Sequence, residues 1–259
     1  MLDTLEQWVL VDFYLMKNSE QKIKKVVIIP TYNESENIKF LLDKLVDLNL
    51  NCLIIDDGSP DGTAKIVSEH RLYKKNIFLI DRGSKNGYAS ACIEGFNWAL
   101  NQKFETIIQM DADHSHSYTD LEIMLSQFSN TDLLIGSRYI KGGRIVGWGY
   151  FRKVLSKSAN IFARKMTRSK LNDLTSGFRI YNASIFEKIN LNHIHSEGYG
   201  FLVEVLNQIN NEGFKIKEFP ITFNDRTRGK SKMSTKVIID GVKNTIFIGI
   251  KNFGLKKYI

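Results

Sequence analysis

The sequence predicts an α/β protein with a mainly parallel sheet flanked by helices. Three observations lead to this prediction: β-branched runs alternate with segments of helical periodicity, the alternation repeats between residues 24 and 139, and each run ends in a polar loop. With 259 residues, of which 43% are hydrophobic, the chain is long enough to bury a substantial core. We divide it into an N-terminal extension (1–22), one α/β domain (23–235) and a C-terminal amphipathic helical segment (236–259).

Four strand and helix pairs follow one another after Ile23. The first joins the β-branched run KKVVIIPTYN to the helical pattern NIKFLLDKLVDLN, with Asn33 and Ser35 as candidate helix caps. The next three pairs are NCLIIDDGSPDGT with AKIVSEHRLY, NIFLIDRGSKNG with YASACIEGFNWALNQ, and ETIIQMDADHSHSYTD with LEIMLSQFS. The segment TDLLIGSRY (131–139) supplies a fifth buried strand. Because repeated strand and helix units form parallel sheets with covered faces, these segments indicate a doubly wound layer.

Polar and charged side chains follow each of the five predicted strands. They are Thr31, Tyr32, Asn33 and Glu34, then Asp56, Asp57, Ser59 and Asp61, then Arg82 and Lys85, then Asp111, Asp113 and Ser115, and then Ser137 and Arg138. In parallel α/β sheets, ligands bind beyond the carboxyl ends of the strands. Asp, Asn and Ser are also favoured in turns and helix caps, so DDGSPDGT taken alone fits a turn as well as a binding loop.

The segment IIQMDADHSHSYTD (107–120) ends a buried strand on two carboxylates. Alternate side chains of an extended segment point the same way, so Asp111 and Asp113 can face one point, with Ser115 next on that side. Two carboxylates with open positions suit Mg²⁺ or Mn²⁺ whose remaining ligands are phosphate oxygens and water. The alternative is a pair of caps for the helix that begins near Thr119.

Composition and spacing narrow the class of protein. The net charge of +8 and the pI near 9.3 indicate an anionic partner, which nucleic acid, nucleotide phosphates and an acidic membrane surface all satisfy. No apolar run reaches the ~18 residues of a membrane-spanning helix.

Cys52 and Cys92 share no metal-ligand spacing and lie in apolar segments, so we expect both to be reduced core residues of a cytosolic protein. His114 and His116 lack zinc-site spacing, and we expect both to pack within their loop.

Longer segments carry a more specific signal. In the first half these are VVIIPTYNESENI, LIIDDGSPDGT, MDADHSH and GSRY, which together resemble family 2 glycosyltransferases of the GT-A fold. In that family a nucleotide-sugar lies across the strand ends of a Rossmann-like sheet, and its diphosphate binds a divalent metal. In the second half GWGYFRKVLSKSANIFAR, DLTSGFRIY, GYGFLVEVL and FPITFNDRTRGKSKM resemble the dolichyl-phosphate (polyprenyl-phosphate) mannosyltransferases of this family. The resemblance covers about residues 24 to 235.

The resemblance implies a nucleotide-sugar site made of strand-end residues and of residues from the second half. The matching positions are Pro30, Tyr32, Glu34, Asp57, Asp111, Asp113, Arg179, Glu204, Arg226 and Lys232. Tyr32 is suited to lie against a base or ribose, or else packs within its loop. Arg179 either meets the sugar or diphosphate or braces its loop. Glu204 either binds sugar hydroxyls or forms a salt bridge at the edge of the core.

The family's metal motif falls on Asp111, Asp113 and Ser115, which implies Mg²⁺ or Mn²⁺ as the cofactor. Relatives often carry Gln where this chain has Ser115, so coordination depends mainly on the two aspartates. The residues implied in catalysis are Asp113, Arg138, Arg226 and Lys232.

The acceptor implied by the resemblance is a polyprenyl or dolichyl phosphate. Three residues match positions that hold the lipid phosphate: Arg138, Arg152 and Ser156. The loop RTRGKSK, with Arg226, Ser231 and Lys232, matches a basic loop that closes over the diphosphates. Taken alone, this loop also fits a solvated basic surface.

A phosphomonoester oxygen is ionised near neutral pH, so it can attack the anomeric carbon without a strong general base. The expected reaction is therefore a single displacement with inversion. The resemblance implies that it moves a mannosyl group from GDP-mannose to polyprenyl phosphate. UDP-glucose or another nucleotide-sugar stays open as the donor. A basic nucleic-acid-binding module is the remote alternative. Nucleic acid is not an expected partner, because the chain shows neither a known binding motif nor aromatics interleaved with Lys and Arg on one surface.

Residues 236–259 mix apolar positions with lysines, as an interfacial helix attracted to anionic lipid would. The lysines are Lys236, Lys243, Lys251, Lys256 and Lys257. A terminal helix packed on the domain fits the same pattern. We expect a cytoplasmic protein, peripheral on the cytosolic face of a membrane, alone or with a membrane-anchoring partner protein.

Overall fold

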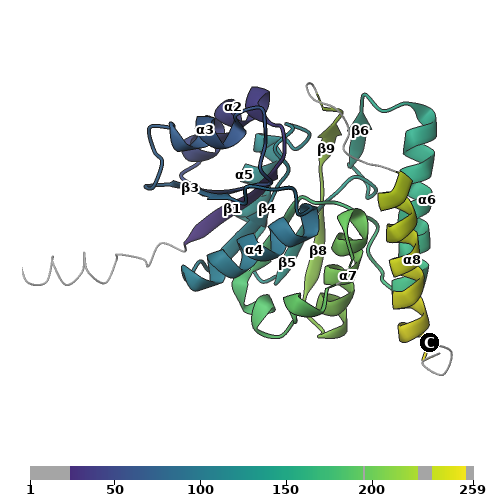
Figure 1. Cartoon of the computed structure of the whole chain (residues 1–259). Coiled ribbons are helices and arrows are strands. Elements are labelled where there is room, and N and C mark those ends of the chain that lie inside the picture. Colours follow the sequence, from purple (N-terminus) through teal and green to yellow (C-terminus); the bar gives the residue numbers. More distant parts are fainter. Residues whose placement is uncertain (1–23, 195, 227–234, 255–259) are drawn as a thin grey trace, which may run out of the picture.

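The structure is a computed structural model that describes residues 24–194, 196–226 and 235–254. The predicted extension at residues 1–22 lies outside this part of the chain. A seven-stranded sheet forms the centre of the molecule, and helices cover it (Figure 1). The prediction of an α/β protein with a mainly parallel sheet is confirmed.

The half of the sheet built first along the chain is parallel. β1 (Lys25–Thr31) lies between β2 (Asn51–Asp56) and β4 (Thr106–Gln109) and pairs in parallel with both, while β3 (Ile77–Asp81) pairs with the outer edge of β2. The chain therefore adds strands on one side of β1 and then switches to the other side at β4. At such a switch point the carboxyl ends of the two strands border a crevice.

The other half contains an antiparallel strand that the hydrophobic pattern did not predict. β7 (Arg179–Asn182) runs antiparallel to β4 and to β5 (Leu133–Ser137), and β8 (Ile216–Pro220) pairs in parallel with β5. The strand order is β3-β2-β1-β4-β7-β5-β8. A second, two-stranded parallel sheet joins β6 (Arg144–Val146) to β9 (Thr222–Asn224).

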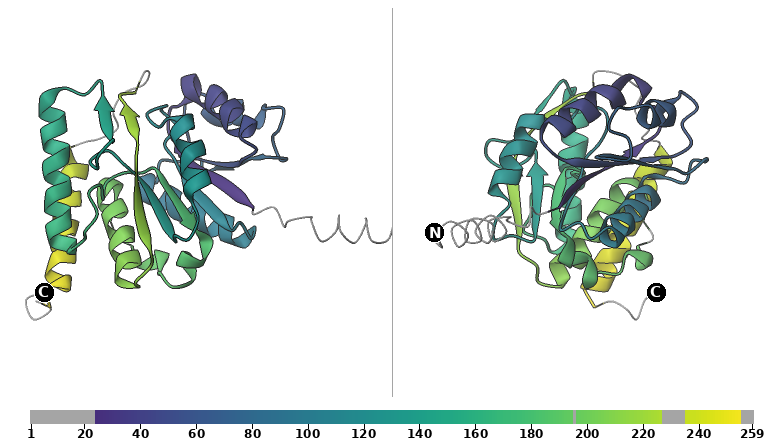
Figure 2. Two further views of the ribbon diagram at one scale, coloured as in Figure 1. Left: turned by 180° about the vertical axis from the view of Figure 1, so that it is seen from behind. Right: turned by 90° about the vertical axis from the view of Figure 1, so that its left-hand side faces the viewer.

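Helices cover both faces of the large sheet (Figure 2). On one face lie α2 (Ser35–Asp47), α3 (Thr63–Ser68) and α5 (Tyr118–Gln127). On the other face lie α4 (Tyr88–Asn101) and α7 (Gly198–Asn211). Each face buries its own hydrophobic cluster, so the sheet separates two layers of core.

The side chains of strand β1 alternate between the two hydrophobic clusters, so helices must pack against both faces of this strand. Val26 and Ile28 belong to the core beneath α4 and α7, whereas Val27 and Ile29 belong to the core beneath α2 and α5. All four side chains are fully buried. Successive side chains of a strand point to opposite faces, so a strand buried on both faces is a continuous apolar run.

Two long helices form one side of the molecule. α6 (Tyr150–Thr167) and α8 (Thr235–Asn252) lie side by side, and α8 also packs against α7 (Figures 1 and 2). The contact between α7 and α8 is close because two glycines meet: a Cβ at Gly200 would lie 3.3 Å from Gly241 Cα. Among the described residues, no helix combines the length and apolar character that crossing a membrane requires. Two 3-10 helices lie between β7 and α7: η1 (Ala183–Glu187) and η2 (Leu191–His193).

The prediction that Asn33 and Ser35 cap α2 is wrong, because side chains of a loop distant in sequence accept the N–H groups at the start of this helix. Asn33 has a φ of 55°, and Glu34 occupies the N-cap position without a side-chain cap bond. Instead, Asp61 Oδ2 accepts the Ser35 N–H at 2.9 Å and Thr63 Oγ1 accepts the Glu34 N–H at 3.0 Å. The loop after β2 therefore holds the loop after β1 in place.

Gly95 on α4 allows this helix to approach the sheet closely. A Cβ here would lie 2.6 Å from Ile28 Cγ2 and 3.0 Å from Ile55 Cδ1. We expect Gly95→Ala to lower the free energy of unfolding by about 1–3 kcal/mol, although Ala is the better helix former. Chemical denaturation measures this value. Asn97→Ala changes an exposed position of the same helix, so it is the control and should not destabilise the protein. If Gly95→Ala were as stable as the unaltered protein, the packing argument would be contradicted.

Candidate active site

A cavity of about 790 Å³ opens at the carboxyl ends of β1 and β4. The loops after the first five strands line it, together with residues near the start of α7 and around the end of β9. The predicted site residues that line it are Pro30, Tyr32, Glu34, Asp57, Asp111, Asp113, Arg138 and Arg226. The fold thus brings strand ends that are far apart in the sequence together around one cavity.

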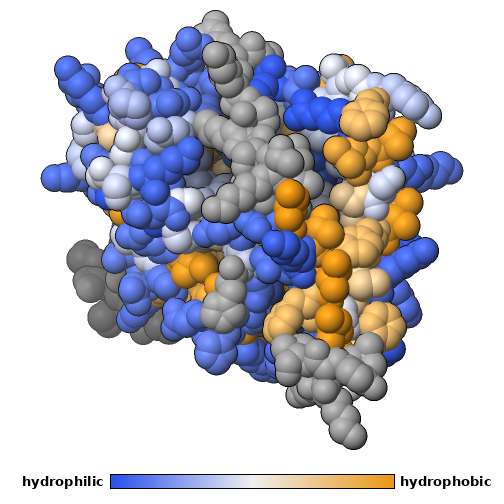
Figure 3. All heavy atoms as spheres, turned by 45° about the vertical axis from the view of Figure 1, so that its right-hand side comes forward, coloured by the Kyte–Doolittle hydropathy of each residue, from blue (hydrophilic) through white to orange (hydrophobic). Residues whose placement is uncertain are grey.

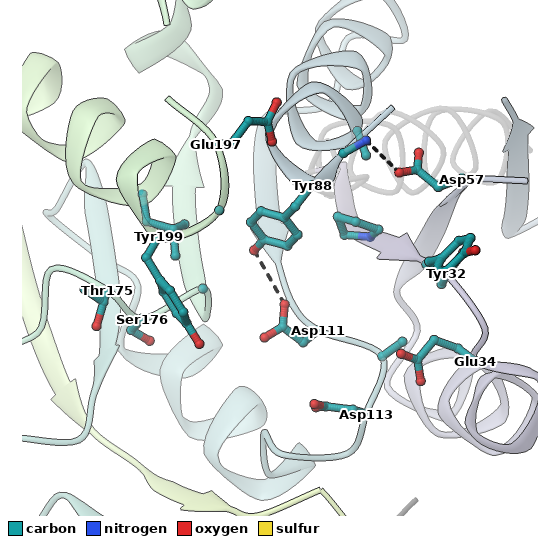
Figure 4. A pocket seen from close by; sticks show the side chains of 18 of the residues that line it. Tyr32, Glu34, Asp57, Tyr88, Asp111, Asp113, Thr175, Ser176, Glu197 and Tyr199 are labelled. Carbon is teal, nitrogen blue, oxygen red and sulfur yellow. Dashed lines mark hydrogen bonds between the residues drawn. The ribbon is translucent and has the colours of Figure 1, made fainter. Parts of the chain in front are cut away.

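One wall of the cavity combines an aromatic ring with a fixed carboxylate (Figure 4). Lys85 Nζ lies 4.1 Å from the centre of the Tyr32 ring, and both side chains line the cavity. Asp57 accepts hydrogen bonds from Arg82 Nη1 at 2.6 Å and from the Gly87 N–H at 2.9 Å. These two bonds hold the loop that carries Lys85, so Asp57 shapes this wall.

Asp111 and Asp113 follow β4 and line the cavity together (Figure 4). Burial, and then the negative charge of Asp113, raise the pKa of Asp111 to about 7. Burial also opposes ionisation of Asp113, but hydrogen bonds from Ser115 and the charge of Arg226, whose Nη2 lies 3.3 Å from Asp113 Oδ2, hold its pKa below the usual range. The two carboxylates therefore form an electrostatically unfavourable pair that a cation would relieve.

Ser115 does not line the cavity and instead forms hydrogen bonds with the carboxylate of Asp113. Its hydroxyl donates to Asp113 Oδ1 at 2.6 Å, its N–H donates to the same oxygen at 3.1 Å, and the residue is buried. His116 stacks on Phe178 with ring centroids 4.6 Å apart. Burial lowers the pKa of His116 to about 4, so its ring is neutral at neutral pH. The ring packs as expected, and His116 also lines the cavity.

Ser117, and neither aspartate of the pair, caps α5. Its Oγ accepts the Asp120 N–H at 3.3 Å. The interpretation of the two aspartates as caps is therefore wrong, which leaves their carboxylates available to the cavity. His114 binds the Tyr118 hydroxyl at 2.6 Å through Nδ1, as expected for a histidine that packs within its loop.

Tyr88 was not predicted, yet it is the side chain that contacts Asp111. Its hydroxyl donates to Asp111 Oδ1 at 3.5 Å (Figure 4). The same hydroxyl accepts a hydrogen bond from Gln109 Nε2 at 2.9 Å. Tyr181 in turn donates to Gln109 Oε1 at 2.8 Å. Burial raises the pKa of Tyr88, so the hydroxyl stays protonated. Tyr88 lies 23 residues before Asp111, and no local sequence signal relates the two.

Residues of the second half form the opposite wall of the cavity (Figure 4). They are Thr175 and Ser176 in the loop before β7, and Glu197 and Tyr199 at the start of α7. Glu197 Oε2 accepts the Ala89 N–H at 3.4 Å, which ties this wall to α4. None of these four residues was predicted, although they lie in or beside the segments DLTSGFRIY and GYGFLVEVL on which the resemblance rests.

Arg138 lines the cavity but is already paired. Its Nε and Nη2 donate to the two carboxylate oxygens of Asp173 at 2.7 Å each, and Nη2 also donates to Thr175 Oγ1 at 2.8 Å. Only 6% of Arg138 is exposed. Burial disfavours its charge, but the charge and hydrogen bonds of Asp173 outweigh burial and raise the pKa of Arg138. The pair therefore anchors the loop before β7 to the end of β5.

Arg152 and Ser156 lie one turn apart on α6, beside the cavity and not in its lining. The Arg152 guanidinium lies 4.0 Å from the centre of the Trp148 ring, and its Nη1 donates to Asp225 Oδ1 at 3.0 Å. Ser156 Oγ accepts the Tyr139 hydroxyl at 2.8 Å. The buried indole N–H of Trp148 has no hydrogen-bond partner in the described part of the chain. These side chains form a polar cluster next to the cavity.

The structure does not bring Arg179 or Glu204 to the cavity lining. Arg179 is fully buried in β7 and donates to three main-chain carbonyl groups, those of Leu174, Ser176 and Leu202. This placement corrects the alternative in which Arg179 meets the sugar, since the guanidinium braces the loop before β7. Glu204 accepts the Ser196 N–H at 3.0 Å. Ser231 and Lys232 lie outside the described residues.

Comparison with known proteins identifies the family. Residues 26–190 match the sequence model described as glycosyl transferase family 2. The chain is 37% identical over 232 residues to polyprenol monophosphomannose synthase from Mycolicibacterium smegmatis, with 88% of each protein covered. It is 36% identical over 230 residues to undecaprenyl-phosphate mannosyltransferase from Micrococcus luteus, with 88% of this chain and 95% of that protein covered.

Solved structures share the fold. Glucosyl-3-phosphoglycerate synthase from Mycobacterium tuberculosis, in complex with Mn²⁺, UDP-glucose and phosphoglyceric acid, superposes with a TM-score of 0.64 at 14% identity, over 91% of this chain and 81% of that one. Its complex with Mn²⁺, UDP and glucosyl-3-phosphoglycerate gives a TM-score of 0.63 at 12% identity, over the same shares of the two chains. At these identities the likeness shows the fold alone, which is the GT-A fold. The family match and the two sequence relatives go further: the chain belongs to glycosyltransferase family 2.

Proposed function

We propose that the chain is an inverting glycosyltransferase that moves a mannosyl group from GDP-mannose to the phosphate of a polyprenyl phosphate. The observation that carries the proposal is the meeting of two carboxylates, Asp111 and Asp113, with the cations Arg138 and Arg226 in one cavity. The names of the two sequence relatives support a mannosyl group and a prenyl-type phosphate. They do not name the nucleotide, and we propose GDP-mannose on the resemblance of the second-half segments to polyprenyl-phosphate mannosyltransferases.

The donor nucleotide is assigned to the wall beside β1, β2 and β3. The Tyr32 ring can lie against a flat base or ribose, and Lys85 supplies a cation next to it. Pro30, Glu34 and Asp57 border the same region. A cavity of about 790 Å³ is of the size that binds ligands of this class, for which typical pockets measure roughly 300–1,000 Å³.

The carboxylate pair fits a divalent cation. Burial and mutual repulsion oppose two negative charges on Asp111 and Asp113, and a divalent cation held by both would remove that cost. Among the described residues there is no cluster of three or more His, Cys, Asp or Glu side chains, so phosphate oxygens and water would supply the other ligands. When bound, Mg²⁺ or Mn²⁺ neutralises charge on the departing nucleoside diphosphate.

The acceptor phosphate is assigned to the side of the cavity that faces α6. Arg138, Arg152 and Ser156 supply a cationic and hydroxyl-bearing edge there, and Arg226 lies between this edge and the carboxylates. The phosphate oxygen is already ionised at neutral pH, so it can displace the nucleoside diphosphate directly and invert the anomeric carbon. Arg226, which contacts Asp113, is suited to move to a phosphate when substrate enters.

A membrane surface would present the lipid acceptor. Hydrophobic side chains gather on the side of the molecule formed by α6 and α8 (Figure 3). The exposed ones include Tyr150, Phe151, Val154, Leu155 and Ile161 of α6, and Ile239, Val242, Ile246 and Phe247 of α8. Lys243 and Lys251 are exposed on α8. These features support a peripheral position on the cytosolic face, alone or with a membrane-anchoring partner protein.

Transfer of labelled sugar to a short polyprenyl phosphate tests the proposed function. We expect mannolipid from GDP-mannose, no glucolipid from UDP-glucose, and dependence on Mg²⁺ or Mn²⁺. Asp113→Asn should lower the rate at least about 100-fold, because it removes charge that holds the metal, and the metal in turn binds the diphosphate. Glu122→Gln, at an exposed position of α5, is the matched control and should retain full activity. Glucolipid as the main product would replace the proposed donor, and a fully active Asp113→Asn would remove the carboxylate pair from the mechanism.

The raised pKa of Asp111 predicts a gain in stability when its charge is removed. Because the folded-state pKa is about 7 and the usual pKa of an aspartate is 3.8, the metal-free protein loses stability as the pH rises between these values. We therefore expect metal-free Asp111→Asn to melt roughly 2–6 °C higher than the unaltered protein at pH 8, with a smaller difference at pH 5. Calorimetry at both pH values measures this. A difference that does not change with pH, or one shared by Glu122→Gln, would contradict the electrostatic cause.

A further inference from the structure

The positive charge of the chain is concentrated in one segment. Residues 133–172 contain ten Lys and Arg residues and no Asp or Glu, whereas the rest of the chain holds 26 Lys and Arg against 28 Asp and Glu. The segment runs from β5 through β6 and α6 to the residue before Asp173. The net charge of +8 therefore arises from this part of the molecule.

Four cations of this segment line a shallow surface pocket of about 290 Å³ between β6 and α6. Arg144 is on β6, Lys153 and Lys157 lie one turn apart on α6, and Arg138 is shared with the large cavity. Tyr139, Gly143, Ile145 and Val154 complete the lining, which contains no acidic side chain. The pocket therefore presents several donors and no acceptor carboxylate to a bound group.

Three of these cations have no counter-charge in the described part of the chain. Arg138 is paired with Asp173, but no ion pair joins Arg144, Lys153 or Lys157 to any described carboxylate. Side chains of like charge that converge on one hollow repel one another unless an anion lies between them. Arginine and lysine together suit a phosphate, which accepts several charge-assisted hydrogen bonds.

The surroundings of the pocket favour a lipid phosphate. On α6, Lys153 and Lys157 border the exposed apolar side chains, and Val154 belongs to both surfaces because it lines the pocket and is 44% exposed. Tyr150 and Phe151, at the start of the same helix, are 85% and 80% exposed. Cations beside an apolar helix face match the boundary between headgroups and acyl chains of a bilayer. A nucleic acid would leave this apolar face in water.

We propose that the pocket between β6 and α6 binds the phosphate headgroup of an anionic membrane lipid that is distinct from the acceptor. The headgroup lies among Arg144, Lys153 and Lys157, while the exposed apolar residues of α6 contact the acyl region. Arg138 lines both this pocket and the large cavity, so the two lie side by side. A lipid bound in the pocket therefore holds this side of the large cavity toward the bilayer. The proposal rests on the membrane association in the proposed function.

Vesicle binding by the full chain tests this site. Sedimentation with phosphatidylcholine vesicles, and with vesicles that also contain phosphatidylglycerol, gives the affinity for each surface. We expect Lys153→Gln/Lys157→Gln to weaken binding to the anionic vesicles about tenfold and to leave binding to phosphatidylcholine unchanged. The matched control is Lys165→Gln/Lys170→Gln, which removes the same charge from the same basic segment outside the pocket and should weaken binding less than about twofold.

Three further measurements separate this site from its alternatives. Transfer to a short polyprenyl phosphate in detergent should be unchanged in Lys153→Gln/Lys157→Gln, and its loss would place the pocket in the acceptor site. Inorganic phosphate should not displace the protein from anionic vesicles at low millimolar concentration, and such displacement would indicate a site for free phosphate. Equal weakening of vesicle binding in both double variants would mean diffuse attraction and would overturn the proposal. Binding to duplex DNA is the third measurement: if Lys153→Gln/Lys157→Gln reduced it and left vesicle binding unchanged, the proposal would also be overturned. A normal vesicle pattern without any mannolipid product would contradict the proposed function alone.

Discussion

The closeness of Asp111 and Asp113 is the constraint on which the rest of the site depends. Two buried carboxylates repel each other, so neighbouring groups must hold them in place. Ser115 fixes Asp113 from within the loop, and Tyr88 contacts Asp111 from the start of α4. Through Gln109 this network continues to β7, so the carboxylates are connected to both halves of the sheet.

Two buried arginines join the second half of the chain to that centre. Arg138 binds Asp173 across the loop before β7, and Arg179 holds the same loop through main-chain carbonyl groups. A buried guanidinium is costly unless each donor is satisfied, so these bonds specify one position for the loop. The loop supplies Thr175 and Ser176 to the wall opposite the nucleotide side. The two arginines thus position the loop that forms this wall.

The molecule separates its charges in a way that suits two substrates of different character. Carboxylates gather at the switch point between β1 and β4, where, in the proposed function, a divalent metal would join them to the diphosphate of the donor. Cations gather around α6, beside a hydrophobic face. A water-soluble donor and a lipid acceptor would therefore reach the reaction centre from different sides.

Sequence periodicity and motif order by themselves determined the five early strands, the convergence of their polar ends, and the resemblance to a glycosyltransferase family. These are local features, because a strand or helix pattern is set by neighbours along the chain. Only the tertiary structure decided that Asp61 and Thr63 hold the start of α2, that Tyr88 supports Asp111, and that Arg179 is a brace. Each of these contacts joins residues from separate elements or depends on burial, and no local pattern encodes which distant group satisfies a buried donor.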